Sequence, residues 1–350
     1  MPLFIDLHID NSLTLDIIKQ AHLADKALQA KHGVRYLQIM LNQPQGYLFC
    51  LMEGPDKESC ARVHQEAHGH IACNILEITE SDFSALVSNK QMDSLDFTLN
   101  GDGSLDTGIR TLLYISLLGS PENCRTTKEI INKLLKQSDG RSGESFENQL
   151  MVLFDSTTIA VDTAMSIRQS ITESNVSVEL RMAANLGPPL KEKGNFFEDV
   201  RKSVEHFAFL SENGQITISS KAMQLYTGDR KNNINALKVV QAADEKFLDE
   251  LMGSLEKVWN KNDLTMDDFA REIGVSKSQL ARKLKTLVEF TPNDFIKEYK
   301  LRKAVSLMDD QRLNMAEISM EVGFSNPSYF TKCFRKRFGK APSEYGTMAS

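Results

Sequence analysis

The spacing of apolar residues divides the chain into three regions with different expected secondary structure. Residues 1–82 contain short alternating runs such as LFIDLHI, typical of strands, and two stretches with helical spacing. Strand-like and helical patterns alternate again over residues 108–228. Beyond residue 243 only helical periodicity remains. The pattern predicts an α+β protein with an all-α C-terminal domain.

Two polar stretches separate these regions. Residues 83–107 and 229–243 lose the apolar periodicity and are rich in Ser, Asp, Asn and Gly, as linkers are. A chain of 350 residues is also longer than a single core usually supports. We therefore predict three domains, at residues 1–82, 108–228 and 244–350.

The order of elements in the first domain predicts a particular sheet. Strands are expected at LFIDLHI, VRYLQIML, YLFCLME and CNILEIT, with helices over residues 13–31 and 57–68. A turn at Pro44-Gln45-Gly46 joins the two middle strands. This βαββαβ order is the ferredoxin-like, split βαβ arrangement.

Six of the seven histidines fall in this first domain. His64 and His68 stand four positions apart on the second helix, so they face the same side. His8 ends a strand, and His22 is followed one turn later by Asp25. Clustered imidazoles suit nickel, zinc or copper. We predict a metal site formed by His8, His22, His64 and His68; the alternative is a set of surface or interface histidines.

The same region resembles a small family of nickel-binding, ferredoxin-like proteins. The shared motifs are a strand with Asp-x-His, a helix start with Ala-His-x-x-Asp, a Gly-Val-x-Tyr strand and the helix sequence RVHQEAHG; here they fall at Asp6 and His8, Ala21, His22 and Asp25, Gly33, Val34 and Tyr36, and residues 62–69. The resemblance implies a response to metal, with nickel favoured over zinc. It also implies that two chains pair through an exposed face of the sheet.

The C-terminal domain contains one helix-turn-helix pattern twice. The spacing Ala270-x3-Gly274-x-Ser276 returns as Ser319-x3-Gly323-x-Ser325. A long helix over residues 292–308 connects the two units. In the last long helix, Phe330, Phe334 and Phe338 recur every four residues and are expected to face inward, with basic residues around them. Two such units fit two successive major-groove faces of double-stranded DNA, ~34 Å apart.

The outer positions of the second helix in each unit are the predicted DNA contacts. They are Lys277, Ser278, Gln279 and Arg282 in the first unit, and Asn326, Ser328, Tyr329, Lys332 and Arg335 in the second. Arg and Gln can contact base edges bidentately, whereas Lys and Ser more often contact phosphates. The alternative for each basic residue is a solvated helix face.

Residues 244–345 resemble the DNA-binding domain of AraC/XylS-type transcription regulators. The residues that carry the resemblance are Ala304, Gly323-Phe324-Ser325, Ser328-Tyr329-Phe330, Phe334, Phe338-Gly339, Pro342 and Tyr345. Ser319 stands where the family usually has Ala, and it fits the same tight packing. The resemblance implies sequence-specific promoter binding and a separate regulatory domain.

The central domain resembles a class III nucleotidyl cyclase homology domain. The cues are RTLLYISLLGS, LFDSTTIAVDTAMSIRQSI, GNFFEDV and GQITISSKAMQLY, in that order. Cyclases hold two metal ions on two aspartates, but Ser116 and Asn148 occupy those positions here, and Lys202 and His206 replace the late Asn and Arg. Without those carboxylates we predict no catalysis. The domain is then a dimerisation module or a sensor of a nucleotide or small ligand, and His206 is expected to be a solvated helix residue.

Charge and cysteine usage add to this interpretation. Residues 247–350 carry 17 Lys and Arg against 15 Asp and Glu, whereas residues 1–246 carry 24 against 32. An acidic body joined to a mildly basic tail fits a sensor attached to a DNA reader. The five cysteines form no Cys-x-x-Cys pair and are expected to be reduced.

These observations predict a dimeric, DNA-binding transcription regulator controlled by a metal ion or a small ligand. No apolar run approaches the ~20 residues of a membrane span, and the N-terminus does not resemble a signal peptide, so we expect a cytoplasmic protein without membrane contact. Two alternatives stay open: a divergent nucleotidyl cyclase fused to a DNA-binding domain, and a nickel-binding buffer or chaperone.

Overall fold

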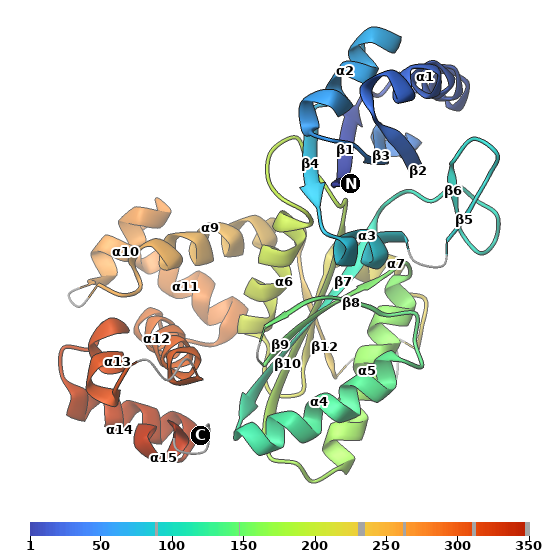
Figure 1. Cartoon of the computed structure of the whole chain (residues 1–350). Coiled ribbons are helices and arrows are strands. Elements are labelled where there is room, and N and C mark those ends of the chain that lie inside the picture. The colour runs from blue at the N-terminus through green and yellow to red at the C-terminus, as the bar shows by residue number, and fades with distance from the viewer. Residues whose placement is uncertain (88–89, 147, 230–234, 262–263, 310–312, 347–350) are drawn as a thin grey trace.

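The computed structural model describes residues 1–87, 90–146, 148–229, 235–261, 264–309 and 313–346. Within them lie an N-terminal sheet domain, a central sheet domain and a C-terminal group of helices (Figure 1). No helix in these ranges is long and apolar enough to cross a membrane.

The N-terminal domain has the predicted βαββαβ order. Its elements are β1 (Leu3–Ile9), α1 (Leu15–Leu28), the 3-10 turn Gln29–His32, β2 (Arg35–Asn42), the 3-10 turn Gln43–Gln45, β3 (Tyr47–Glu53), α2 (Lys57–Ala67) and β4 (Asn74–Ile78). The strands pair antiparallel in the order β2-β3-β1-β4. Thr14 and Asp56 cap the two helices by accepting hydrogen bonds from the backbone N–H groups of Ile17 and Ser59.

The two faces of this sheet have different surroundings. Helices α1 and α2 cover one face, where Phe4 and Ile18 lie in a common apolar cluster. On the opposite face Ile5 and Phe49, both fully buried, belong to a larger cluster that extends into the central domain. The expectation that two chains pair through an exposed face of this sheet is therefore wrong, because the central domain of the same chain covers that face.

The segment predicted as the first linker is partly structured. It includes the end of α3 (Glu80–Val87) and a two-stranded hairpin of β5 (Gln91–Met92) and β6 (Thr98–Leu99). Phe97 is fully buried in the core beneath α1 and α2. A single aromatic residue among polar neighbours gives no periodic signal, so the sequence pattern did not reveal this packing.

The central domain begins with a second βαββαβ unit. It consists of β7 (Arg110–Gly119), α4 (Pro121–Leu135), β8 (Arg141–Phe146), β9 (Gln149–Phe154), α5 (Thr157–Glu173) and β10 (Val178–Gly187), followed by α6 (Glu198–Leu210), β11 (Ile216–Ser219), α7 (Ser220–Leu225) and β12 (Leu237–Val240). The strand order is β12-β11-β10-β7-β9-β8. The sheet is mixed: β10-β7-β9-β8 pair antiparallel, whereas β10 with β11 and β11 with β12 pair parallel.

Strand β12 lies inside the segment predicted as the second linker. Its four residues are too few to show a clear alternation, and pairing with β11 supplies the missing stabilisation. Residues 230–234 of that predicted linker lie outside the described residues. Helices α4 and α5 pack on one face of the central sheet, whereas α6 packs on the other face and contacts α9 of the C-terminal domain.

The C-terminal domain is all helical, as predicted. It contains α9 (Ala242–Val258), α10 (Met266–Ile273), α11 (Lys277–Val288), α12 (Pro292–Asp309), α13 (Met315–Glu321), α14 (Pro327–Phe338) and α15 (Pro342–Gly346). Gly323 has φ +73°, and a Cβ there would lie 2.7 Å from the carbonyl oxygen of Asn260, so the turn requires glycine. The first three helices join the large apolar cluster, while α12 to α15 enclose a separate core around Phe330 and Phe334.

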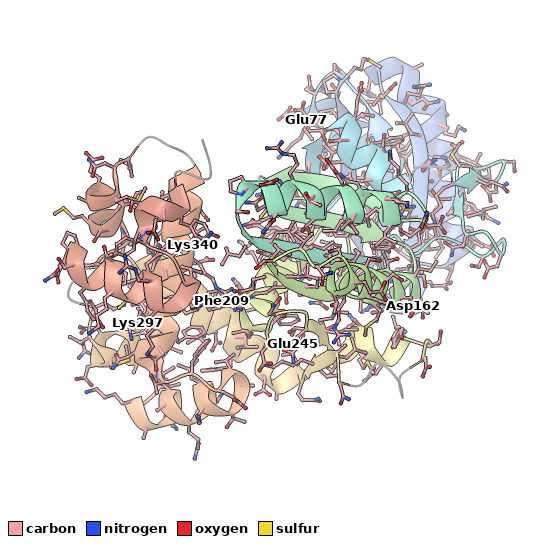
Figure 2. All side chains as sticks on the ribbon, turned by 90° about the horizontal axis from the view of Figure 1, so that it is seen from below. Glu77, Asp162, Phe209, Glu245, Lys297 and Lys340 are labelled. Atoms are coloured by element: carbon pink, nitrogen blue, oxygen red, sulfur yellow. The ribbon has the colours of Figure 1, made fainter. Side chains whose placement is uncertain are left out.

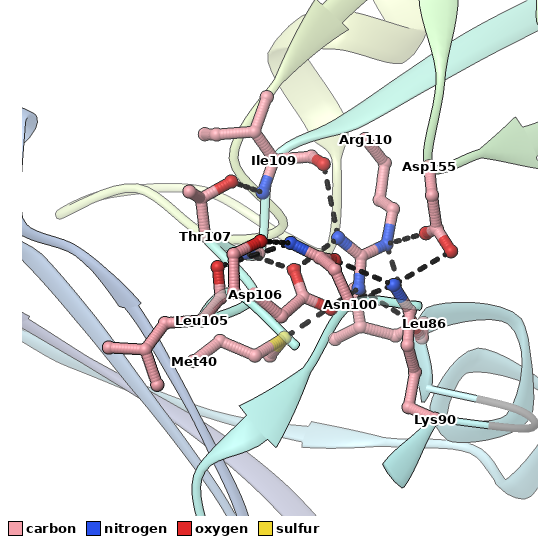
Figure 3. A network of polar contacts seen from close by, with 12 residues as sticks. Met40, Leu86, Lys90, Asn100, Leu105, Asp106, Thr107, Ile109, Arg110 and Asp155 are labelled. Atoms are coloured by element: carbon pink, nitrogen blue, oxygen red, sulfur yellow. Dashed lines mark hydrogen bonds and ion pairs between the residues drawn. The ribbon is translucent and has the colours of Figure 1, made fainter. Parts of the chain in front are cut away.

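A buried arginine holds the junction between the N-terminal and central domains (Figure 3). Arg110 is 1% exposed and donates to both carboxylate oxygens of Asp106, at 2.9 and 2.8 Å. It also donates to the carbonyl oxygen of Leu86 at 2.8 Å and lies 2.9 Å from Asp155. Lys90 approaches the same two aspartates. These contacts tie the end of α3, the connector and the end of β9 to the first strand of the central sheet.

Replacing Arg110 by alanine is expected to destabilise the protein strongly. The change leaves Asp106 buried without its guanidinium partner, and such losses cost about 3–5 kcal/mol. Chemical denaturation followed by circular dichroism measures the change in the free energy of unfolding. Arg125→Ala, an exposed arginine on α4, is the control and should change stability by less than about 0.5 kcal/mol. Equal effects of the two substitutions would contradict the importance of this junction.

Candidate functional site

Carboxylates and imidazoles converge between β1 and the two helices of the N-terminal domain. Asp6 and His8 point to the same side of β1 because they are two residues apart. His64 and His68 lie one helical turn apart on α2, and Asp25 comes from α1. Asp6, His8 and His64 have potential ligand atoms within 4.8 Å of one another, and so have Asp25, His64 and His68. His64 is shared by both groups.

His64 is held between two carboxylates. Its Nε2 lies 2.7 Å from Asp6 Oδ2, and its Nδ1 lies 3.2 Å from Asp25 Oδ2, with the side chain only 1% exposed. Burial alone would lower the pKa of His64, but the Asp6 and Asp25 carboxylates outweigh it and raise that pKa to about 10. Burial opposes ionisation of Asp6, yet His8 and His64 keep the pKa of Asp6 below its ordinary value. The two carboxylates therefore favour the charged form of His64.

The donor set fits a divalent metal ion. His8 Nε2 and Asp25 Oδ1 are buried and make no well-formed hydrogen bond among the described residues, although they lie 3.5 Å from Asp6 Oδ2 and 3.2 Å from His68 Nε2. Buried polar atoms without partners are uncommon unless a water or an ion satisfies them. Imidazole and carboxylate ligands together suit nickel or zinc. Asp6, His8 and His64, or Asp25, His64 and His68, are the residues that would hold the ion.

His22, the fourth predicted ligand, lies outside both groups of potential ligands. His22 Nε2 lies 2.9 Å from Asp96 Oδ2 on the hairpin. It nevertheless lines the same cavity of about 290 Å³ as the other three predicted histidines. The predicted set of metal ligands omits Asp6. The Asp-x-His spacing on the strand is the signal that could have identified it.

The predicted DNA-contact residues all lie at the surface of α11 and α14 or at the N-cap of α14. Ser276 and Gln279 form a capping box at the start of α11, and Asn326 caps α14 by accepting from the N–H groups of Ser328 and Tyr329. The side chains of Gln279 and Asn326 are thus used in capping. Lys277 pairs with Asp267 at 2.6 Å. Ser278, Arg282, Lys332 and Arg335 remain exposed on the two helices.

Another basic residue of α14 points toward the central domain. Arg337 donates to Glu298 on α12 at 2.6 Å and to Glu179 on β10 at 2.9 and 3.0 Å. Arg302 of α12 donates to the same Glu298 at 2.7 Å. Phe209 of α6 lies at this junction (Figure 2), where its ring is 5.4 Å from that of Phe295. The second helix-turn-helix unit is therefore fixed to the central sheet by ion pairs.

The cyclase-like positions lie beside this junction. Ser116 on β7 pairs with Gln149 on one side and with Arg181 on the other. All three line a cavity of about 190 Å³ whose opposite wall includes Tyr299 and Arg302 of α12. No carboxylate stands at position 116 or 148. Ser116 therefore lies in a cavity between the central sheet and the helix that connects the two helix-turn-helix units.

His206 is not the solvated histidine that was predicted. It is 6% exposed, and its Nδ1 lies 3.0 Å from Asp249 while its Nε2 lies 3.7 Å from Glu256, both on α9. Burial opposes the charge, but these carboxylates raise the pKa of His206 to about 8. The partners follow more than 40 residues later. Helical periodicity within α6 could not reveal them.

Two parts of the chain match known families. Residues 4–78 match a family described as nickel responsive protein SCO4226-like, and residues 269–348 match a helix-turn-helix domain family. Neither match extends into residues 79–268.

Individual proteins resemble the same two parts. The chain is 37% identical over 106 residues to histidine kinase P4 of Formosa agariphila, covering 30% of this chain and 8% of that protein. It is 29% identical over 107 residues to the transcriptional regulator ExsA of Pseudomonas aeruginosa, covering 31% of this chain and 38% of ExsA. The crystal structure of SCO4226 from Streptomyces coelicolor is 38% identical, with 22% of this chain and 94% of that chain covered and a TM-score of 0.21. The chain spans less than two fifths of the two curated relatives.

The helices from α10 to α15 define a double helix-turn-helix domain. It is an AraC-type domain, and it is combined in this chain with an N-terminal SCO4226-like domain of the nickel-responsive family.

Removing the charge of His206 should change how stability depends on pH. Because the folded pKa of about 8 exceeds the ordinary value of 6.5, the ion pairs stabilise fully below about pH 6.5, and the stabilisation is lost as the pH rises through 8. The shift corresponds to at most about 2 kcal/mol. Both partner carboxylates are half exposed, so screening reduces the contribution to about 1 kcal/mol.

Urea unfolding of wild type and His206→Gln, followed by fluorescence of the single tryptophan, tests this dependence. Trp259 reports on the right region because it packs against both helix-turn-helix cores. His206→Gln should be less stable than wild type at pH 6 and equal to it at pH 9. A constant difference across that range would show that the charge of His206 does not contribute.

Proposed function

We propose that this protein is a DNA-binding transcription regulator whose DNA binding is controlled by a divalent metal ion, with nickel as the first candidate. The observation that carries the proposal is one chain holding both a buried site of carboxylates and histidines and two capped helices with exposed basic residues. The two family matches support the two halves of the proposal. Double-stranded DNA is the partner, and two chains acting together would double the number of reading helices.

The roles of the reading helices follow from their exposed side chains. Arg282 and Arg335 are the candidates for base contacts, because a guanidinium can bind a guanine edge with two hydrogen bonds. Ser278, Ser328, Tyr329 and Lys332 are proposed to contact phosphates or bases nearby. Gln279 and Asn326 are proposed to act mainly by fixing the start of each helix, where the backbone N–H groups also favour phosphate.

A physical path joins the metal site to the reader. Strand β1 carries Asp6 and His8 on the helix side and Ile5 on the side that packs toward the central domain. The central sheet in turn holds α14 through Glu179 and Arg337. We propose that ion binding shifts this packed arrangement between two states with different DNA affinity. When bound, the ion would supply a charge that replaces the proton on His64.

Two other functions are kept as alternatives. A nickel buffer or chaperone would use the same metal site without specific DNA binding, and footprinting on genomic DNA distinguishes it. A divergent nucleotidyl cyclase would need metal-binding carboxylates, which positions 116 and 148 lack. Measuring cyclic nucleotide formation with magnesium or manganese tests that alternative. We propose that the central domain serves as a scaffold or ligand-binding domain and not as an enzyme.

Replacing Arg335 by alanine should weaken binding to the operator by about 1–3 kcal/mol. The substitution removes an exposed guanidinium from α14 without disturbing the core around Phe334. Gel-shift titration at fixed salt measures the affinity. Arg271→Ala is the matched control, since this exposed arginine lies on α10, outside the two reading helices. Wild-type affinity in Arg335→Ala would remove this residue from the proposed interface.

Nickel should change the operator affinity of wild-type protein by several fold, and His68→Ala should lose that response. His68 is a candidate ligand with its side chain 14% exposed, so its removal disturbs the core less than removal of His64 would. Genomic footprinting with and without nickel chloride identifies the operator and its metal dependence. His32→Gln is the control, because His32 pairs with Glu66 outside the cavity. If the footprint is specific but insensitive to nickel in wild type, DNA binding stands and the metal response is rejected.

A further inference from the structure

A carboxylate from outside the SCO4226-like segment contacts a histidine of the cavity lining. Asp96 lies on the β5–β6 hairpin, beyond residue 78 where the family match ends. Its Oδ2 is 2.9 Å from Nε2 of His22 and 2.8 Å from Nζ of Lys26, both on α1. His22 is only 3% exposed. The hairpin therefore places a carboxylate against His22, one of the residues that line the cavity of the N-terminal domain.

The position of Asp96 is fixed by its own segment. Asp96 has φ +64°, a left-handed conformation that aspartate tolerates better than most residues. Asp93 Oδ1 accepts hydrogen bonds from the N–H groups of Leu95 and Phe97, at 2.8 and 3.0 Å, and Phe97 is fully buried. The N–H of Ile39 on β2 donates to the carbonyl oxygen of Asp96 at 2.8 Å. The carboxylate is thus held in place by a turn, an apolar anchor and a strand.

Contacts continue from His22 to the shared residue of the metal site. The ring of His22 meets that of Tyr36 edge to face, with centroids 5.2 Å apart. The hydroxyl of Tyr36 lies 3.4 Å from both ring nitrogens of His64. Tyr36 therefore contacts both His22 and His64. Asp96, His22, Tyr36 and His64 thus form a continuous series of contacts.

The hairpin is also joined to the central domain. After β6 the chain returns to the sheet, where the N–H of Leu41 donates to the carbonyl oxygen of Asp106 at 2.9 Å. Asp106 is the buried partner of Arg110 at the junction of the two domains. The segment from Asp96 to Asp106 consequently connects a residue beside the histidines to the first strand of the central sheet.

We propose that Asp96, which lies outside the family domain, is a positioning residue of the histidine site because it holds His22 in place. Through this contact the β5–β6 hairpin responds to ion binding. Loss of a carboxylate that orients the residues around a metal typically lowers metal affinity by about 10- to 100-fold. His22 is in neither group of potential ligands but is joined to His64 through Tyr36, so we expect the lower end of that range. Lys26 compensates the charge of Asp96, so the carboxylate stays ionised beside a buried ring. This inference rests on the proposed metal response and identifies the element that transmits it.

Hydrogen–deuterium exchange of the full chain, with and without nickel chloride, tests the inference together with calorimetric nickel titration. In wild type, nickel should change the exchange of residues 91–99 several fold. Asp96→Asn keeps the shape of the side chain and removes its charge, so nickel affinity should fall by about 10-fold or more and the hairpin should stop responding. Asp102→Asn is the matched control, because Asp102 caps an exposed turn of the same connector and contacts no histidine.

A second variant separates positioning from folding. His22→Gln removes the other partner of the contact, and its effect on hairpin exchange should not add to that of Asp96→Asn in the double variant. Additive effects, or an unchanged hairpin in wild type that does bind nickel, would overturn the role of Asp96. If wild type binds no nickel, both this inference and the proposed metal response fail, whereas DNA binding is unaffected. The same result in Asp96→Asn and Asp102→Asn would also reject the inference.

Discussion

One continuous apolar cluster holds the three domains together, and the other features depend on it. It begins with Ile5 and Phe49, on the face of the N-terminal sheet opposite α1 and α2. It continues through Leu112 of the central sheet and Phe207 of α6, and it ends in the first helix-turn-helix unit around Phe269. Burying such surface contributes roughly 25 cal/mol per Å². Since the domains share this core, a change of packing in one is felt by its neighbour.

The second helix-turn-helix unit is held in a different way. Its core around Phe334 is separate and meets the central domain at Leu118 of β7. The polar links are the ion pair of Arg337 with Glu179 and a hydrogen bond from the hydroxyl of Tyr345 to the carbonyl oxygen of Gly119. Ion pairs that are partly exposed are weaker and more sensitive to salt than apolar packing. The attachment of the second unit to the central domain is therefore expected to be more sensitive to salt than that of the first.

Local patterns predicted the elements well and the long-range contacts poorly. The N-terminal βαββαβ unit and the repeated helix-turn-helix follow from periodicity and turn residues, which act over a few positions. The second βαββαβ unit was not predicted, because its strand β8 has no clear apolar alternation. Strand β12 and the buried Phe97 were missed because their stability comes from partners elsewhere in the fold. For the same reason the sequence pattern reveals neither the burial of His206 nor the contact of Asp96 with His22. The exposed positions on α11 and α14 were predictable, whereas the capping roles of their first residues depend on backbone geometry.

Strand β1 is the element through which the proposed metal site would act on the central domain. Alternation along a strand places Asp6 and His8 toward the helices and Ile5 and Leu7 toward the central domain. A change in the charge balance around His64 acts on a strand whose other face is packed without space to adjust, because protein interiors are close-packed. Movement must then be shared between the cluster and the Asp96 hairpin. Both routes lead to the first strand of the central sheet, which is the sheet that carries Glu179 and holds α14.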